Sequence, residues 1–265
     1  MLLFYFCVLL AFGCKQNENE GNSSEIGNYI LALNNGDLRI NEKVFHKSIG
    51  DCKTEKNCVK IHIEYPEIIS DGEAYDSINI FIKNTLINLS FNEDLYNSLD
   101  ELSDSLFSSY LSLKEDFPDY NTGWYIDSKI AITAMNFDIL SLKTVETIFT
   151  GGANPSYNLL YNNFDISNGL EIVFSDIISE ENYSQLEKHA ENIFRVSKGI
   201  SKNESLSDKG FWFENNQFSL NDNFTIADSG IVFYYNLYEI APRSMGSTEL
   251  FIPKNKLIGL TKIYK

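Results

Sequence analysis

The sequence is poor in basic residues and in histidine. Of its 265 residues, 21 are Lys or Arg, 37 are Asp or Glu and 3 are His, which gives a formal net charge of −16. Phosphate backbones and anionic lipid surfaces are bound through Lys and Arg, so this balance argues against a nucleic-acid-binding protein and against peripheral attachment to anionic lipid. The same charge permits a basic partner.

Motifs of known catalytic sites are also missing. The sequence has no nucleophile elbow of the G-x-S-x-G type, no H-E-x-x-H pair, no P-loop and no Rossmann glycine pattern. His62 lies on the polar side of an alternating stretch and His189 lies among Glu and Lys residues, so both are expected to be solvated surface side chains. We therefore expect a protein that is not an enzyme, with no catalytic residues, no bound metal and no cofactor.

The N-terminal apolar run is short. Leu2–Phe12 has 11 residues, whereas a helix that crosses a bilayer needs about 20, so residues 1–13 are expected to be a secretory signal peptide. The stretch Leu10–Cys14 resembles the lipobox of bacterial lipoproteins, which implies that Cys14 is lipidated and anchors the chain to an envelope membrane. The alternative is an ordinary signal peptide with Cys14 close to the cleavage site.

The segment that follows is polar. Residues 14–38 are rich in Asn, Glu, Gly and Ser, a composition that does not bury enough apolar surface to fold alone, so a lipidated tether is expected here. Lys15 and the acidic residues after it resemble the surface-export signal of Bacteroidetes lipoproteins. The expected location is therefore the periplasm or the outer-membrane surface.

Two cysteines flank a short loop between strand-like segments. Cys52 and Cys58 are separated by Lys53–Asn57, and in an oxidising compartment this spacing favours a disulfide. A metal pair is the second interpretation, with His46 and His62 as the only nearby imidazoles, and zinc would need four ligands in matched geometry. Two free thiols are the third.

Beyond the tether, composition and periodicity predict a folded body. Hydrophobic residues make up 43% and aromatic residues 14%, which excludes wholesale disorder. Helical spacing predicts helices over 73–89, 95–113 and 178–197. Alternation predicts strands near 60–65 (ended by Pro66), 125–133, 140–149, 157–165, 218–220, 224–227, 231–237 and 249–252. This order favours an α+β fold, two α/β-mixed units on antiparallel sheets with helices grouped between strands.

Two short clusters stand out in this pattern. The first is Phe149–Pro155, with paired glycines that permit positive φ and close backbone approach. The second is Tyr235–Gly246, a strand that runs into a loop containing Pro and Gly. In the simplest interpretation, the first is a tight strand connection and the second a hairpin-like connection with buried aromatics.

In this order, the two clusters resemble a pair of bacterial envelope domains. The family has a T-G-G-A-H-like motif between its halves and a Y-E-I-x-P-Y-x-x-G-like motif near the C-terminus. Here Asn154 replaces the usual His and Arg243 the usual Tyr. The second domain is similar to the C-terminal domain (DUF3298) of the lysozyme-sensing anti-sigma factor RsiV. The first is similar to the domain (DUF4163) that precedes it in RsiV and in the peptidoglycan deacetylase PdaC.

The resemblance implies domains at 39–155 and 156–265. It implies a non-enzymatic envelope lipoprotein whose partner is a basic protein such as lysozyme. The alternative is a module that binds cell-wall glycan or accompanies an enzyme that does. Because loops carry recognition on rigid sheets, the expected ligand-binding residues are Gly151, Gly152, Asn154, Pro155, Tyr238, Glu239, Pro242, Arg243 and Gly246. We also expect Arg243 to pair with the carboxylate of Glu239.

Overall fold

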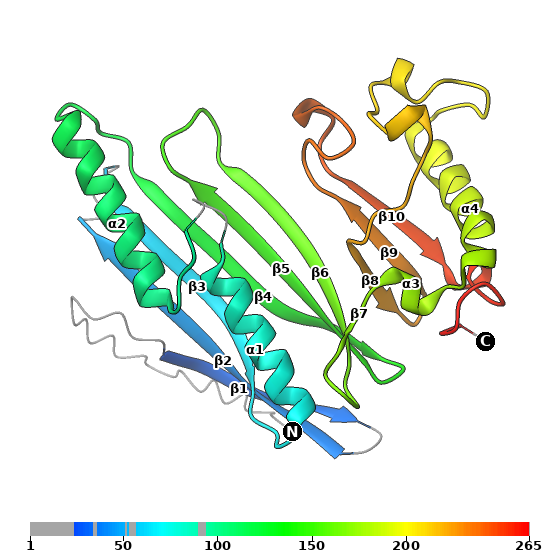
Figure 1. The fold of residues 1–265 in the computed structure, drawn as a ribbon, viewed down its shortest axis with the longest axis horizontal. Coiled ribbons are helices and arrows are strands. Elements are labelled where there is room, and N and C mark those ends of the chain that lie inside the picture. Colours follow the sequence, from blue (N-terminus) through cyan, green and yellow to red (C-terminus); the bar gives the residue numbers. More distant parts are fainter. Residues whose placement is uncertain (1–23, 34–35, 51, 53–56, 90–93, 265) are drawn as a thin grey trace, which may run out of the picture.

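The computed structural model describes residues 24–33, 36–50, 52, 57–89 and 94–264 (Figure 1). The expected signal peptide and Cys14 lie outside these residues. Within them, a seven-stranded sheet and a three-stranded sheet each carry helices on one side. This is the expected α+β fold with antiparallel-dominated sheets.

In the large sheet, the strands lie side by side in chain order from β1 to β7. Every neighbouring pair is antiparallel except β3 with β4, which is parallel. The strands are β1 (Ser24–Leu33), β2 (Gly36–Ile49), β3 (Val59–Ile68), β4 (Trp124–Asn136), β5 (Ile139–Phe149), β6 (Ser156–Asp165) and β7 (Glu171–Ile172). Pro66 does not end β3, because β4 pairs with β3 only as far as Glu64 and proline is tolerated on the open edge beyond.

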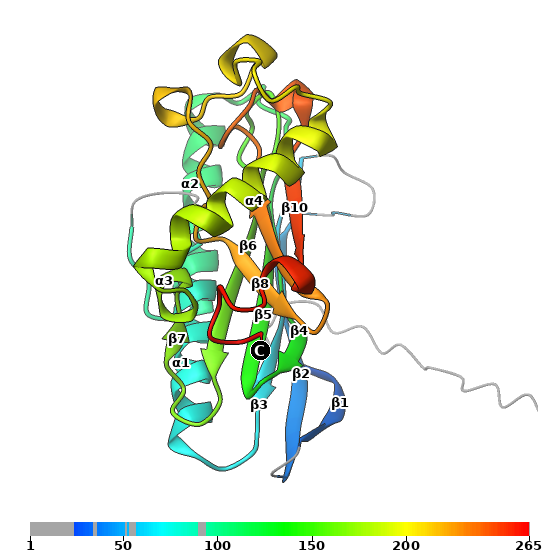
Figure 2. The same ribbon diagram turned by 90° about the vertical axis from the view of Figure 1, so that its right-hand side faces the viewer.

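The parallel pair β3 and β4 requires a crossover, and two helices supply it. Helices α1 (Glu73–Ile87) and α2 (Leu99–Asp116) both lie on one side of the large sheet (Figure 2). Their apolar stripes, with Ile78, Ile82 and Leu106 fully or almost fully buried, pack on alternate residues of the strands. The first hydrophobic core lies between these two layers.

Helix α2 begins later than the periodicity predicts. The Ser98 hydroxyl accepts from the Glu101 backbone N–H, and the Glu101 carboxylate accepts from the Asn97 N–H, which is a reciprocal capping arrangement. Leu95 therefore lies before the helix and is 86% exposed. The helical spacing that included Leu95 was coincidental.

The tether prediction is wrong over part of its length. Residues 24–33, inside the segment 14–38, form β1 and pair with β2 from Ser24↔Val44 to Leu33↔Gly36. Tyr29 and Leu31 of β1 pack against the first core. The second half of β1, Tyr29–Leu33, is an apolar run that the polar average composition of residues 14–38 conceals.

The predicted boundary at 155/156 also differs from the structure. The loop at 150–155 joins two strands of one sheet, since β5 and β6 pair from Ile139↔Asp165 to Ile148↔Ser156. Strand β7 then adds to the other edge of β6. The first unit therefore continues to Ile172, and the first motif is a hairpin loop within it.

The second unit has an aromatic core. It consists of α3 (Phe174–Ile177), α4 (Glu180–Lys198), β8 (Phe224–Ala227), β9 (Gly230–Tyr235) and β10 (Thr248–Pro253), with four 3₁₀ turns at 207–209, 214–216, 243–245 and 254–256. Phe174 contacts the rings of Phe224 and Phe233 edge to face at 5.3 and 5.0 Å. Phe218, predicted to lie in a strand, is a buried loop residue in the same core.

The last described residue helps to close this unit. The Tyr264 hydroxyl shares its proton between the carbonyl oxygens of Ala227 and Gly230, at the turn between β8 and β9. The Tyr264 ring also meets Phe137 of the β4–β5 turn edge to face at 5.6 Å. Tyr264 thus connects the small sheet to the large one.

The free edge of β6 is covered by asparagine side chains of the second unit. Asn223 accepts from the Tyr161 N–H at 2.8 Å and donates to the Leu159 carbonyl at 2.7 Å. Asn236 accepts from the Leu159 N–H at 2.8 Å and donates to its carbonyl at 3.0 Å. Further along, the buried Asn163 of β6 donates to the carbonyl of Phe224 at 2.8 Å. These amides take the place of an eighth strand.

The disulfide between Cys52 and Cys58 is present, with the two Cα atoms 5.1 Å apart. The disulfide closes the connection between β2 and β3. Of the three interpretations open for these cysteines, the structure supports the disulfide.

Replacing Asn223 by Ala tests the amide bridge to β6. The variant leaves the Tyr161 N–H without a protein partner, so the free energy of unfolding should fall by about 1–3 kcal/mol. Urea unfolding followed by circular dichroism measures this. Asn154→Ala, in an exposed loop, is the matched control and should stay within about 0.5 kcal/mol of the parent. Equal effects of the two variants would contradict the role assigned to Asn223.

Candidate functional site

The two predicted ligand loops lie against each other although 88 residues separate their contacting members. Arg243 Nη1 donates to the carbonyl oxygen of Pro155 at 3.2 Å. This contact joins the β5–β6 loop, residues 150–155, to the β9–β10 loop, residues 236–247. We call these two segments the motif loops.

The predicted pairing of Arg243 with Glu239 is wrong. The Glu239 carboxylate instead accepts from the Asn236 backbone N–H and from the Asn221 side-chain amide, both at 2.7 Å. Glu239 thereby fixes the turn that leaves β9. The guanidinium of Arg243 donates to a neutral carbonyl and forms no ion pair with Glu239, the one acidic residue of its loop.

In the first motif loop, the two glycines have different surroundings. Gly151 has φ of +91°, and a Cβ there would lie 1.9 Å from the Tyr120 hydroxyl oxygen. That hydroxyl accepts from the Trp124 indole N–H at 2.8 Å, so Gly151 packs against a fixed aromatic pair. Gly152 has open space around it and Asn154 is exposed. Of these three residues, Gly152 and Asn154 are available to a ligand.

The second motif loop presents an aromatic side chain to solvent. Tyr238 has φ of +65°, an uncommon backbone conformation for a residue with a side chain, and it is 58% exposed. Ile240 and Ala241 after it are buried in the second core. Pro242 then leads into the 3₁₀ turn Arg243–Met245, which Gly246 ends at φ of +75°. The loop is thus anchored on both sides of its exposed tip.

Trp212 is a neighbour of this loop that the sequence analysis missed. Its backbone N–H donates to the Ile240 carbonyl at 2.8 Å, and its side chain is 52% exposed. Trp and Tyr are among the side chains most enriched at binding hot spots. In the sequence, the available signal was its position between Phe211 and Phe213, since alternation with two buried aromatic residues points Trp212 outward.

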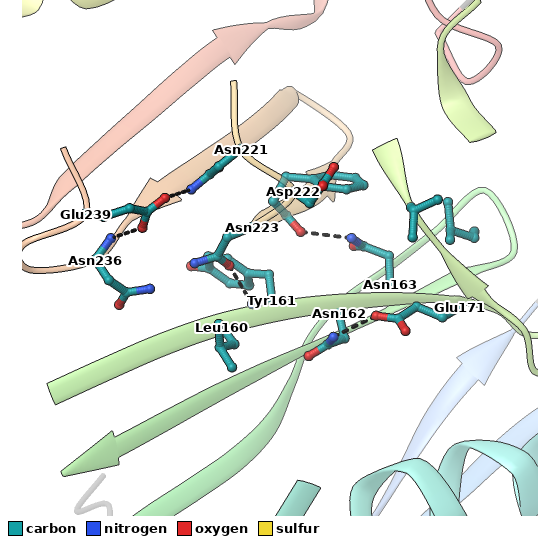
Figure 3. Close-up of a pocket in the computed structure, with 13 residues that line it drawn as sticks. Leu160, Tyr161, Asn162, Asn163, Glu171, Asn221, Asp222, Asn223, Asn236 and Glu239 are labelled. Atoms are coloured by element: carbon teal, nitrogen blue, oxygen red, sulfur yellow. Dashed lines mark hydrogen bonds between the residues drawn. The ribbon is translucent and has the colours of Figure 1, made fainter. Parts of the chain in front are cut away.

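A cavity of about 420 Å³ opens between the two units beside the motif loops (Figure 3). One wall is β6 and β7, and the other is the segment before β8 together with the turn after β9. Its amide lining is Asn162, Asn163, Asn221, Asn223 and Asn236, and its carboxylate lining is Glu171, Asp222 and Glu239. Glu239 is the one predicted ligand residue that lines it.

The lining offers hydrogen-bond acceptors and negative charge. It holds three carboxylates and no Lys, Arg or His among its residues. The side-chain oxygen of Asn221 is buried and has no hydrogen-bond partner. Burial raises the pKa of the Tyr161 phenol, and the nearby carboxylate of Glu249 raises that pKa further. A group that donates hydrogen bonds, above all a cationic one, fits these surroundings.

Two features are absent from the described part of the chain. No group of three or more His, Cys, Asp or Glu side chains there is arranged to hold a metal ion. None of the described helices is both long enough and apolar enough to span a membrane. His62 pairs with Glu64 at 3.2 Å, and burial lowers the pKa of its cross-strand neighbour His46.

Comparison with known proteins identifies both units. Residues 52–157 match the family model described as deacetylase PdaC, and residues 173–255 match the family model described as a protein of unknown function, DUF3298. No curated protein matches the chain.

Two solved crystal structures are similar to nearly the whole chain. A DUF3298-family member from Bacteroides fragilis is 19% identical with a TM-score of 0.66, over 86% of this chain and 94% of that one. A DUF3298-family protein from Pseudomonas aeruginosa is 17% identical with a TM-score of 0.63, over 85% of this chain and 94% of that one. At these identities the likeness establishes the shared fold.

Replacing Gly151 by Ala tests whether this glycine is structural. The positive φ and the contact with the Tyr120 hydroxyl should lower the free energy of unfolding by about 1–3 kcal/mol. Gly152→Ala, with no atom within 4 Å of the added Cβ, should change it by less than about 0.5 kcal/mol. Thermal unfolding of the two variants measures the difference. A Gly151→Ala protein as stable as the Gly152→Ala protein would show that the packing against Tyr120 is unimportant.

Proposed function

The chain joins a PdaC-type domain to a DUF3298 domain, and from this pairing we propose that it is a non-enzymatic binding protein of the cell envelope whose ligand is a basic protein, lysozyme being the model case. The surface that binds is formed by the motif loops and the cavity beside them. The N-terminal pattern Leu2–Cys14 supports a lipid anchor at Cys14.

The observation that carries this proposal is the charge of the cavity. Its lining has three carboxylates, Glu171, Asp222 and Glu239, and no basic residue to neutralise them. A Lys or Arg side chain that enters it gains charge-assisted hydrogen bonds. The net charge of −16 adds a long-range field that speeds the encounter with a cationic protein.

The exposed aromatic residues at the same end supply apolar contact. Trp212 and Tyr238 are more than half exposed and both adjoin Ile240, through a backbone hydrogen bond and through sequence. Interface hot spots are enriched in Trp and Tyr, and a polar rim surrounds the interface core. The contact of Arg243 with Pro155 keeps the one cation of the loop occupied while the carboxylates face the ligand.

Glycan binding is the second candidate, and a specific observation favours it. The same exposed Trp212 and Tyr238 are side chains on which a sugar ring stacks, and amides of Asn162 and Asn221 line the neighbouring cavity. A glycan would bind through hydrogen bonds and stacking, with little dependence on salt. Salt dependence therefore separates the two candidates.

Calorimetric titration of lysozyme into the full-length protein in neutral detergent tests the main proposal. We expect binding at low salt that weakens by about tenfold or more as the Debye length falls from about 10 Å at 0.1 M salt to about 3 Å at 1 M. Absence of heat and of a complex at tens of micromolar would remove lysozyme as the ligand and promote the glycan.

A pair of charge variants separates the cavity from the overall field. Glu171→Gln with Asp222→Asn removes two charges from the lining, whereas Asp76→Asn with Asp119→Asn removes two exposed charges elsewhere. Both double variants change the net charge equally. We expect the first to weaken binding at least about fivefold more than the second. Equal weakening would assign binding to net charge alone.

Fractionation of a Cys14→Ala variant tests the proposed anchor. The parent should be found in the membrane fraction, because several acyl chains give stable attachment whereas one does not. The variant should be released as soluble protein or remain unprocessed at its N-terminus, as judged by mass spectrometry. Membrane partitioning equal to that of the parent, after correct processing, would refute lipidation at Cys14.

A further inference from the structure

A second groove lies in the first unit, on the side of the large sheet that carries the helices. Its volume is about 310 Å³, at the lower end of the range for small-molecule sites. One wall is the face of α1 that bears Phe81, Asn84 and Asn88. The other is formed by Glu146 of β5 and Asn158 of β6. This groove shares none of these residues with the motif loops.

Glu146 is buried here without a cation. The residue is 8% exposed, and within the described residues no ion pair reaches its carboxyl group. Desolvation by burial raises the pKa of Glu146, and the hydrogen bond with the Asn158 side chain only partly opposes this. A carboxyl group so placed is expensive to retain for packing alone, because an apolar residue of similar size would fill the same space.

Two hydroxyl groups on the same face are buried with no partner. Ser128 lies directly across from Glu146 in the β4–β5 register, and Thr144 lies two residues before it on β5. Both are 1% exposed, and neither Ser128 Oγ nor Thr144 Oγ1 has a hydrogen-bond partner. Around them the same face is apolar, with Ile126 and Ile130 in the first core. Unpaired buried polar groups are rare and call for a specific explanation.

The lining restricts the chemistry of a ligand. A lone carboxyl group and the absence of Lys, Arg and His from the lining disfavour an anion. The side-chain amides of Asn84, Asn88 and Asn158 both donate and accept, and Phe81 offers an apolar face. A neutral molecule that carries several hydroxyl or amide groups on an apolar ring satisfies all of these groups together.

We propose that the groove between α1 and strands β5 and β6 is a binding site for a neutral saccharide, with Glu146, Asn158 and Asn84 as its polar contacts. Ser128 and Thr144 lie next to Glu146 on the same face of the sheet, outside the groove lining. The two sites share Leu160 of β6 but no polar lining residue, and they have opposite requirements for ligand charge, so this proposal is independent of the basic-protein ligand.

Saturation-transfer NMR on the full-length protein tests the site, with cellotriose and the trimer of N-acetylglucosamine as probes. Spermidine is the cationic comparison and citrate the anionic one. We expect saturation transfer to the ring protons of at least one trisaccharide and none to citrate. Absence of transfer to both trisaccharides overturns the proposal, and so does spermidine binding that displaces a bound sugar.

Variants locate the bound sugar. Asn84→Ala on the exposed face of α1 and Glu146→Ala in the groove should each raise the dissociation constant at least about fivefold, the loss of one or two hydrogen bonds. Asn192→Ala, an equivalent exposed change on α4, should leave it unaltered. Asn84→Ala keeps the test valid if Glu146→Ala fails to fold. Sugar binding that survives Asn84→Ala but is lost in Trp212→Ala would place the saccharide at the motif loops and overturn the groove.

Discussion

The arrangement of the two units depends on the need of β6 for a partner along its outer edge. A strand edge presents backbone N–H and carbonyl groups that are costly to bury unpaired. A side-chain amide carries one donor group and one acceptor in nearly the geometry of a peptide unit. Asn223 and Asn236 can therefore form hydrogen bonds with the backbone N–H and carbonyl groups of Leu159 and with the N–H of Tyr161. Two loop residues thereby do what a complete strand would do.

This substitution explains why a cavity exists between the units. A strand added to β6 would lie about 4.8 Å away along its whole length and leave no space. Amides reach the edge only at the points where they bond, and the remaining space is open and lined by polar groups. The same bridge brings the turn after β9 toward β6, so that Arg243 can reach Pro155. Cavity and motif loops are therefore consequences of one contact.

The sequence predicts the parts of the fold that have regular periodicity. Strands β4, β5 and β6 and helices α1 and α4 follow from alternation and helical spacing, and the cysteine pair follows from its position between strands. Strand β1 was missed because the polar average composition of residues 14–38 conceals the apolar run Tyr29–Leu33. Phe218 was assigned to a strand because a buried apolar loop residue gives the same signal as a strand residue. The second error reflects a tertiary contact that local sequence does not reveal.

The sequence pointed to the two motif loops but not to the cavity beside them or to its chemistry. Short motifs identified the two loops, which the structure does bring together. Neither the role of Gly151 as a packing residue nor the separation of Arg243 from Glu239 could be derived, since both depend on Tyr120 and Pro155, residues distant in sequence. The asparagines have no periodic signal at all, and their importance emerges only when β6 is seen to end a sheet. The lipid anchor and the ligand remain predictions.

The contact of Tyr264 with Ala227 and Gly230 has a consequence for the order in which the protein assembles. Domains form from the N-terminus during synthesis, and the large sheet through β7 can pair before the second unit is complete. The second core includes Tyr264, which lies 34 positions after Gly230 in the chain. Asn223 and Asn236 are held in place only when that core has formed. During that interval the edge of β6 is exposed, and an exposed strand edge can pair with another chain. Between the synthesis of β6 and that of Tyr264, the edge of β6 therefore lacks the amides that cover it in the folded protein.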